Sequence, residues 1–238
     1  MIQYERQQKI LDFMREKRSA TVKEIADMIF VSESSVRRDI EHLENMGLVS
    51  RVYGGVVLKE HKNSVVPLSL RDVENHNVKD KLARRAAKMI PDGTTVFIDS
   101  SSTTWRIVKH IDHCKDLRII TNSLTIFKEL ENENVEAYCT GGIFRPKTQD
   151  FVGFAAEKYI RSVNADIVFF SAQAISEDGE ISDVSAEWTS LRRAMLDRAK
   201  RKVFLCDSSK IGLRRPFILC TKDEVDEIIC DGALPWQK

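Results

Sequence analysis

The chain has 238 residues, with 37 basic against 36 acidic side chains and a formal net charge of +1. Hydrophobic residues make up 42% of it and charged residues 31%, which is typical of a globular protein and excludes a disordered or collagen-like chain. No apolar run approaches the roughly 20 residues of a membrane-spanning helix, and the N-terminal residues show no signal-peptide core. Five cysteines without CxxC spacing argue against a disulfide framework, so we expect a reduced, cytoplasmic protein. Three of them lie in or near apolar strands and are predicted to be buried packing residues: Cys206, Cys220 and Cys230.

The first 58 residues are predicted to form three short helices and a β-hairpin. Apolar and charged side chains are spaced over Tyr4–Lys17 as in an amphipathic helix. Thr21 is placed to cap a second helix because Glu24 stands at the capping-box position, and Ser32 is placed to cap a third. Between two short β segments, Tyr53-Gly54-Gly55 supplies the turn of a hairpin. This order of elements predicts a winged helix-turn-helix over residues 1–58.

Residues 78–238 are predicted to form a second domain of alternating helices and strands. A helix at 78–90 is followed by apolar strand candidates with helical stretches between most of them. The strand candidates are Thr94–Ile98, Leu117–Thr121, Val135–Thr140, Ile167–Ser171, Val203–Cys206 and Phe217–Cys220. This alternation indicates an α/β fold with a largely parallel sheet flanked by helices. The polar segment 59–77, which contains Pro67, is predicted to be a linker.

The third predicted helix carries the side chains best suited to contact DNA. In a helix-turn-helix this helix places its N-terminal half in the major groove, where serine reaches phosphates or base edges and arginine pairs with guanine. On the hairpin, Arg51 and Tyr53 are suited to contact the DNA backbone or an adjacent groove. The candidate DNA-binding residues are Thr21, Ser32, Ser34, Ser35, Arg37, Arg38, Arg51, Tyr53 and Gly54.

Other interpretations of this segment remain open. Arg37 can pair with Glu41 one helical turn later, which is typical of a solvated helix face. Residues 1–60 contain 10 basic and 10 acidic side chains, whereas DNA-binding modules are more often basic. A helix-turn-helix also serves as a protein-interaction fold. The pattern of helix, capped turn and glycine hairpin outweighs these points and favours DNA binding.

Polar residues follow four of the predicted strands. Asp99–Thr104 offers consecutive hydroxyls and backbone N–H groups at a helix start, which suit a phosphate. Ligands of open α/β sheets bind at the carboxyl ends of the strands, so four polar strand ends in one sheet predict a site there. Each segment by itself is also typical of a helix cap or a turn. The candidate ligand-binding residues are Asp99, Ser100, Ser101, Ser102, Thr103, Thr104, Asn122, Ser123, Gly141, Gly142, Asp207 and Lys210.

The N-terminal sequence resembles the signature of the DeoR family of bacterial transcriptional regulators. The matching motif is Arg37-Arg38-Asp39, then Leu43-Glu44, Gly47, and Arg51 before Gly54-Gly55. The C-terminal polar segments resemble the effector-sensing domain of the same family, which is related in fold to ribose-5-phosphate isomerase and glucosamine-6-phosphate deaminase. These segments are Asp99–Thr104, Thr121–Ser123, Gly141-Gly142 and Asp207–Gly212.

The resemblance covers essentially the whole chain and implies a function. It implies a repressor of a carbohydrate-metabolism operon whose affinity for operator DNA is controlled by a phosphorylated sugar or related metabolite. It also implies a homo-oligomer, either a dimer or a tetramer. From the residues themselves we expect no cofactor, no metal ion and no membrane partner.

Five positions depart from the pattern of the family. Tyr53 stands where histidine is common in the wing, and Ser101 stands where many members have glycine in the phosphate loop. Ser171 and Ala174 replace two glycines near the expected pocket, where added side-chain atoms narrow the space. Arg192 stands at a lysine position, and arginine is not equivalent to lysine at a ligand site. These departures leave the identity of the effector open.

A sugar-phosphate isomerase or deaminase with an appended helix-turn-helix is the alternative. Such chemistry needs a base within reach of the substrate carbon, for which Asp99, Glu187 and Asp207 are candidates. No combination of a carboxylate with a histidine stands out in the sequence. His110 and His113 lie three residues apart on a predicted helix, but no third ligand nearby completes a metal site. We therefore favour a regulator without catalysis.

Overall fold

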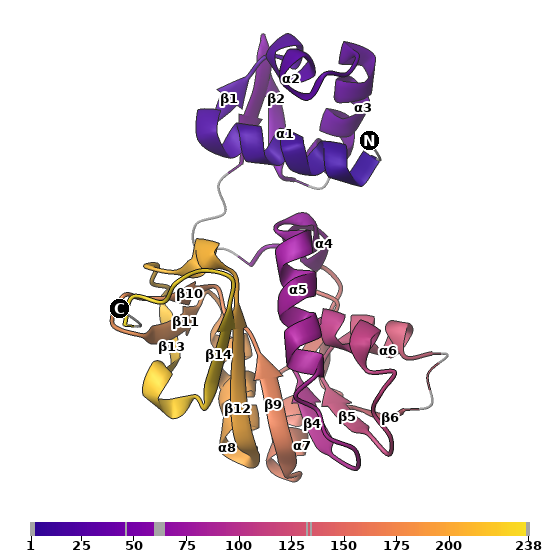
Figure 1. The fold of residues 1–238 in the computed structure, drawn as a ribbon, viewed down its shortest axis with the longest axis vertical. Coiled ribbons are helices and arrows are strands. Elements are labelled where there is room, and N and C mark those ends of the chain that lie inside the picture. The colour runs from indigo at the N-terminus through magenta and orange to yellow at the C-terminus, as the bar shows by residue number, and fades with distance from the viewer. Residues whose placement is uncertain (1–2, 46, 60–64, 132, 134, 237–238) are drawn as a thin grey trace. The chain divides into compact units, whose positions relative to one another are not determined.

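The computed structural model describes residues 3–45, 47–59, 65–131, 133 and 135–236. The chain divides into two compact units, both drawn in Figure 1. The first unit comprises Met1–Lys62 with Ser69–Glu74, and the second comprises Asn63–Leu68 with Asn75–Lys238.

The first unit has the elements predicted for a winged helix-turn-helix. They are α1 (Gln3–Lys17), β1 (Ser19–Ala20), α2 (Val22–Ile29), α3 (Glu33–Asn45), β2 (Val49–Val52) and β3 (Gly55–Leu58). The strands form an antiparallel sheet in the order β1-β3-β2, so the β2–β3 hairpin is the wing. The predicted capping box of α2 is confirmed. The Glu24 amide donates to Thr21 Oγ1 at 3.1 Å, and the Thr21 amide donates to Glu24 Oε2 at 2.8 Å.

A buried carboxylate ties α3 to α1. Asp39 has no exposed surface and accepts hydrogen bonds from the Arg6 guanidinium and, at 3.4 Å, from the Gln7 side-chain amide. The hydrogen bond to Asp39 raises the pKa of Arg6 above its ordinary value. The carboxylate of the Arg37-Arg38-Asp39 motif therefore anchors the helix, because its partners lie on α1 inside the domain.

The segment predicted to be a linker contains regular structure. Within 59–77 the structure has a short helix, α4 (Leu68–Val73), and the start of α5 (His76–Ala87). Residues 60–64 of the same segment lie outside the described residues. The predicted helix at 78–90 corresponds to α5, which begins two residues earlier and ends three residues earlier than expected.

The second unit is built on a six-stranded parallel sheet. Its strands lie in the order β14-β12-β9-β4-β5-β6, and every neighbouring pair is parallel. Their bounds are β4 (Thr95–Ile98), β5 (Arg118–Thr121), β6 (Glu136–Cys139), β9 (Ala165–Phe170), β12 (Ala199–Cys206) and β14 (Glu227–Cys230). This order places β4 and β9 at the centre of the sheet, with their carboxyl ends between those of β12 and β5.

Helices cover both faces of the sheet (Figure 1). Val96 and Ile98 of β4 pack into one hydrophobic cluster, whereas Phe97 packs into another on the opposite face. This alternation is expected for a parallel strand that is buried on both sides. The covering helices are α5, the 3-10 helix η1 (Thr104–His110) and α6 (Leu124–Glu129) on the first face, and α7 (Phe154–Arg161) and α8 (Ala186–Arg198) on the second.

The strand predicted over Phe217–Cys220 lies outside the parallel sheet. It is β13 (Phe217–Thr221), which pairs antiparallel with β11 (Glu180–Asp183), and β11 pairs in turn with β10 (Ala174–Ile175). Adjacent parallel strands need a crossover of about a dozen residues or more, usually a helix. The connection from β12 to β13 is shorter and carries only the 3-10 helix η2 (Ser208–Lys210). The edge strand of the parallel sheet is instead β14, which is not among the strands predicted from the sequence.

The remaining elements are short. The hairpin β7 (Ile143–Arg145) and β8 (Asp150–Val152) follows β6, and the 3-10 helix η3 (Lys222–Glu224) precedes β14. Across the described residues, no helix is long and apolar enough to cross a membrane, and no group of three or more His, Cys, Asp or Glu side chains suits a metal ion. The imidazole of His110 lies 3.1 Å from the carboxylate of Asp80.

Candidate DNA-binding surface and ligand site

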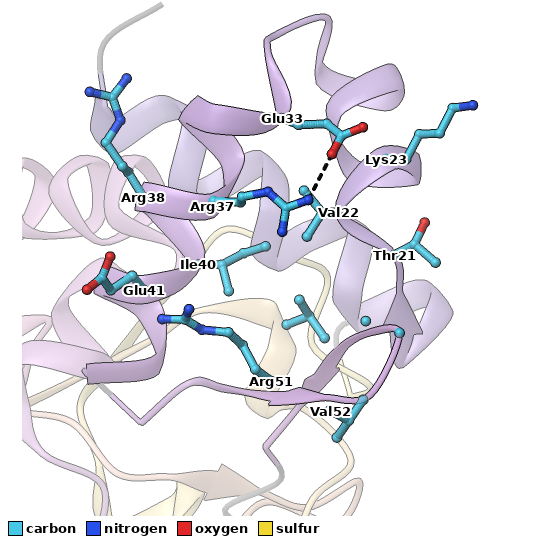
Figure 2. A pocket seen from close by; sticks show the side chains of 13 residues that line it. Thr21, Val22, Lys23, Glu33, Arg37, Arg38, Ile40, Glu41, Arg51 and Val52 are labelled. Atoms are coloured by element: carbon cyan, nitrogen blue, oxygen red, sulfur yellow. Dashed lines mark hydrogen bonds and ion pairs between the residues drawn. The ribbon is translucent and has the colours of Figure 1, made fainter.

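A cleft of about 470 Å³ lies between α2, α3 and the wing (Figure 2). It brings residues from three separate elements to one surface of the first unit. The candidate DNA-binding residues that line it are Thr21, Arg37, Arg38, Arg51 and Gly54. The cleft therefore includes the part of the α3 surface for which the sequence predicts DNA contacts.

The two arginines near the start of α3 differ in their partners. The Arg37 guanidinium donates to Glu33 at 3.0 Å, one turn earlier in the helix, rather than to Glu41 as the sequence suggested. Arg38 has no ion pair within the part of the chain that the structure describes, and Figure 2 shows its side chain pointing away from the other labelled residues. Both side chains are exposed. Arg38 can thus meet a phosphate or a base directly, whereas Arg37 must first leave a carboxylate.

Three serine hydroxyls gather at the start of α3. The Oγ atom of Ser32 lies 2.9 Å from that of Ser34 and 3.0 Å from that of Ser35, and it accepts a hydrogen bond from the Ser35 amide at 3.3 Å. Thr21, by contrast, uses its hydroxyl in the capping box of α2. The serines therefore form a polar, solvent-facing group beside the helix N-terminus.

The wing is fixed to α3 by an ion pair. Glu44 accepts hydrogen bonds from the Arg51 amide at 2.8 Å and from Arg51 Nε at 2.7 Å. The bond from the amide holds the pKa of Glu44 below its ordinary value. At the tip of the hairpin Tyr53 is fully exposed, and the φ of +86° at Gly54 is one that glycine adopts without strain. Arg51 positions the wing, and Tyr53 is the side chain that the wing presents.

In the second unit, the segments that follow β4, β5, β9 and β12 meet at the carboxyl edge of the sheet. The Asn122 side-chain amide donates to Ser100 Oγ at 3.1 Å, which links β5 to β4. The Ser171 amide donates to the Asp99 carboxylate at 3.4 Å, and Lys210 Nζ donates to Ser171 Oγ at 3.1 Å. The structure thus brings together candidates that lie more than 100 residues apart in the sequence.

Several hydroxyls of the Asp99–Thr104 segment are used inside the protein. Ser101 Oγ accepts a hydrogen bond from the Thr104 amide at 3.0 Å, and Ser100 Oγ donates to the Asp150 carboxylate at 3.0 Å. The helix that follows is η1, a 3-10 helix of 7 residues, and not the longer helix that would support an anion at its start. These hydrogen bonds and the short helix therefore weaken the prediction that Asp99–Thr104 binds a phosphate.

Two buried polar atoms of the site have no hydrogen-bond partner among the described residues. They are Oγ1 of Thr103, which is 0% exposed, and Oδ1 of Asn122, which is 2% exposed. Buried polar atoms are nearly always satisfied in folded proteins, by protein groups or by a bound molecule. One hydroxyl and one carbonyl oxygen at this edge therefore lack a partner within the described residues, and either water or a polar group of a ligand can satisfy them.

Two lysines and Asp207 contribute charge to the site. Lys210 Nζ lies 3.6 Å from the Asp207 carboxylate, and the Asn75 side-chain amide donates to Asp207 at 3.0 Å. Burial raises the pKa of Asp207, but the nearby lysines and hydrogen bonds outweigh burial and lower it to about 2. Lys79 of α5 is 4% exposed and donates to Ser102 Oγ at 3.1 Å. Lys79 was not a candidate from the sequence. The sequence feature that could have pointed to Lys79 is its position on the buried face of a predicted helix.

Arg192 is the internal counter-ion of two aspartates. From α8 its Nε contacts the Asp99 carboxylate at 2.5 Å, and its Nη1 contacts the Asp183 carboxylate at 2.8 Å. All three side chains are at most 4% exposed. Burial lowers the pKa of Arg192, but the two carboxylates raise it above its ordinary value. Asp99 is therefore tied to the protein by charge at the point where a ligand-binding role was predicted.

The remaining candidates have local structural roles. Ser123 Oγ accepts a hydrogen bond from the Ile126 amide at 3.4 Å and so caps α6. A Cβ atom at Gly142 would lie 2.6 Å from the Val152 carbonyl oxygen, which explains glycine there. Gly141 adopts a φ of +63° in the turn after β6. Packing and backbone conformation are sufficient reasons for these residues.

Comparison with known proteins identifies both units. Residues 6–62 match the DeoR-like helix-turn-helix domain, and residues 74–232 match the DeoR C-terminal sensor domain. YulB of Bacillus subtilis, an uncharacterised HTH-type transcriptional regulator, is 34% identical over 98% of this chain and 91% of its own length. GlcR of Bacillus subtilis, an HTH-type transcriptional repressor, is 30% identical over 97% of this chain and 89% of its own. Ribose 5-phosphate isomerase A of Methanocaldococcus jannaschii is 16% identical with a TM-score of 0.44, over 58% of this chain and 55% of its own. This chain belongs to the DeoR family of DNA-binding transcriptional regulators, as its N-terminal motif predicted.

Proposed function

We propose that this regulator represses a carbohydrate-metabolism operon and releases or retains its operator in response to a phosphorylated sugar or related metabolite. The observation that carries the ligand half of the proposal is the pair of unpartnered buried oxygens on Thr103 and Asn122. Lys79 and Lys210 stand at the same edge and supply the positive charge that a phosphate needs. The relative GlcR is named as a transcriptional repressor, which supports repression.

We propose further that the protein carries out no catalysis. The bases that an isomerase or deaminase would use are engaged: Asp99 pairs with Arg192, and Asp207 pairs with Lys210. Glu187 is paired with Arg145 at 2.8 Å and is half exposed. None of these carboxylates is free to remove a proton from a bound sugar without first losing a cation.

The proposed mechanism is a shift between two states of a homo-oligomer, a dimer or a tetramer, in the cytoplasm. A ligand changes DNA affinity only if it binds one state more tightly than the other. The α3 surfaces of two protomers would read two half-sites, with Arg38 and the serines at the start of α3 contacting DNA and Tyr53 of the wing beside them. The effector then changes how well both surfaces fit the operator at once.

The DNA half is tested with Arg38→Ala. We expect operator affinity to fall by about 1–3 kcal/mol, or about 5- to 150-fold, because a bidentate contact with guanine is lost. The measurement is fluorescence anisotropy at fixed salt, with DNA from upstream of the protein's own gene. Lys9→Ala, which removes one exposed positive charge from α1, is the control and should change affinity far less. Unchanged affinity in both Arg37→Ala and Arg38→Ala would exclude α3 as the reading helix.

The ligand half is tested with Thr103→Val, which removes the unpartnered hydroxyl and keeps the shape of the side chain. We expect unchanged operator affinity without effector, and an increase of about tenfold in the sugar-phosphate concentration that alters it, since one buried hydrogen bond is lost. Thr94→Val is the matched control, because Thr94 lies at the opposite end of β4 and its hydroxyl bonds to the Pro91 carbonyl. An equal response in both variants would place the ligand elsewhere.

A further inference from the structure

Two cysteines stand side by side at the carboxyl ends of neighbouring strands. Cys206 ends β12, Cys230 ends β14, and the two residues are paired in the parallel register. Directly paired residues of parallel strands point to the same face, and the strands lie about 4.7–4.9 Å apart. A disulfide requires Cα atoms about 4.4–6.8 Å apart, so the backbone already meets this condition.

The two thiols differ in environment. Cys206 is fully buried, whereas Cys230 lies on the edge strand and is half-buried, which departs from the prediction that both are buried packing residues. A hydrogen bond from the Cys206 thiol lowers the pKa of Cys230 to about 7, against the opposing effects of burial and of the Asp231 carboxylate. The same hydrogen bond and burial raise the pKa of Cys206. Cys230 therefore supplies the thiolate, and Cys206 keeps its proton.

We propose that Cys206 and Cys230 are an oxidation site, at which a hydroperoxide such as hydrogen peroxide forms an intrachain disulfide. The Cys230 thiolate attacks one peroxide oxygen, the O–O bond breaks, and the hydroxide that leaves takes up a proton as water. Cys230 is then a sulfenic acid. The Cys206 sulfur attacks the Cys230 sulfur, the S–O bond breaks, and the Cys206 proton leaves with the hydroxyl as a second water. Two thiols are oxidised by two electrons, and one peroxide is reduced.

The disulfide would act on the segment that carries Lys210. Asp207 directly follows Cys206, and Asp231 directly follows Cys230. The Ser208 amide donates to Asp231 Oδ1 at 2.7 Å, so the two strand ends are already joined across this turn. A covalent bond one residue away would remove the freedom of β14 to separate from β12 there. The oxidation state of the pair thus sets the mobility of the Asp207–Lys210 turn, whether or not the turn binds a sugar phosphate.

The test uses the full-length protein with Cys139→Ser, which removes the exposed thiol and leaves four. Reduced protein is treated with hydrogen peroxide, its free thiols are counted after unfolding, and its peptides are mapped without reduction. We expect two thiols to disappear, the peptides of Cys206 and Cys230 to be linked, and dithiothreitol to restore both. Hydrogen exchange of the Ser208 amide should slow by about tenfold in the oxidised protein.

Two further variants separate the steps. With Cys206→Ser added, Cys230 should stop at the sulfenic acid and be labelled by dimedone. With Cys230→Ser added, Cys206 should remain a thiol, as should the buried Cys220, the pKa of which is raised by burial to about 12. Four intact thiols after peroxide, a link between other cysteines, or an unreactive Cys230 in the Cys206→Ser protein would overturn the proposal. A disulfide that leaves Ser208 exchange unchanged would overturn its effect on the turn.

Discussion

Replacing Arg192 by methionine is expected to destabilise the second unit by about 3–5 kcal/mol, because two buried carboxylates lose their cation. Asp99 and Asp183 are each 1% exposed, so neither can regain the lost interaction from water. The measurement is urea unfolding followed by tryptophan fluorescence. All three tryptophans of the chain belong to the second unit, so the signal reports on that unit: Trp105, Trp188 and Trp236.

The adjacent residue gives a matched control for this prediction. Arg193 also forms two ion pairs, with Glu224 at 2.6 Å and with Asp197 at 3.3 Å, but its side chain is 43% exposed. Exposed ion pairs contribute about 1 kcal/mol or less, so Arg193→Met should leave the urea midpoint nearly unchanged. If Arg192→Met and Arg193→Met lower the free energy of unfolding equally, the contribution of the ion pairs of Arg192 with Asp99 and Asp183 does not depend on their burial.

Asp39→Ala is expected to destabilise the first unit by about 2–3 kcal/mol. The substitution removes the hydrogen bonds that join α3 to Arg6 and Gln7 of α1, and hydrogen bonds to a charged group contribute about 1.5–3 kcal/mol. Arg6 is 19% exposed and can turn to water, which keeps the cost below that of Arg192. Hydrogen exchange followed by mass spectrometry should show α1 and α3 exchanging about 30- to 150-fold faster.

Glu41→Ala is the control for this result, since Glu41 is exposed on the same helix. Its effect on exchange should stay within about 0.5 kcal/mol, as for most surface substitutions. If α1 and α3 exchange as slowly in the Asp39→Ala protein as in the unsubstituted protein, Asp39 is not the residue that joins the two helices. Faster exchange in the second unit as well would mean that the substitution is not local.

The parts of the fold that local chemistry determines were predictable from the sequence. Thr21 and Glu24 specify a helix start by their own hydrogen bonds, and apolar runs such as Ile167–Ser171 specify buried strands. The pairing of Phe217–Cys220 was not predictable, because it depends on a two-residue strand, β10, and on β11, both far away in the chain. The amino-acid composition of a strand does not show which sheet that strand joins.

The meeting of the polar strand ends at one edge of the sheet was predictable, whereas the side chains that surround them were not. Strand ends pointed to Asp99 and Ser102. Lys79, which donates to Ser102, comes from a helix that reaches the sheet edge only after folding, and the pairing of Arg192 with Asp99 could not be inferred from the sequence. The partner of Arg37 shows the same limit on a smaller scale. Glu33 and Glu41 are both four residues away, and only the side-chain conformation of the folded helix selects Glu33.

The carboxylates of Glu33 and Glu44 pair with the guanidiniums of Arg37 and Arg51, and DNA phosphates would have to displace them. Affinity for arbitrary DNA comes from counterions that cationic side chains release from the phosphates. A module whose residues 1–60 balance 10 basic with 10 acidic groups releases few of them. We therefore expect brief residence on non-operator sequence, little sequestration of the protein by the rest of the chromosome, and a search that proceeds through solution more than by sliding.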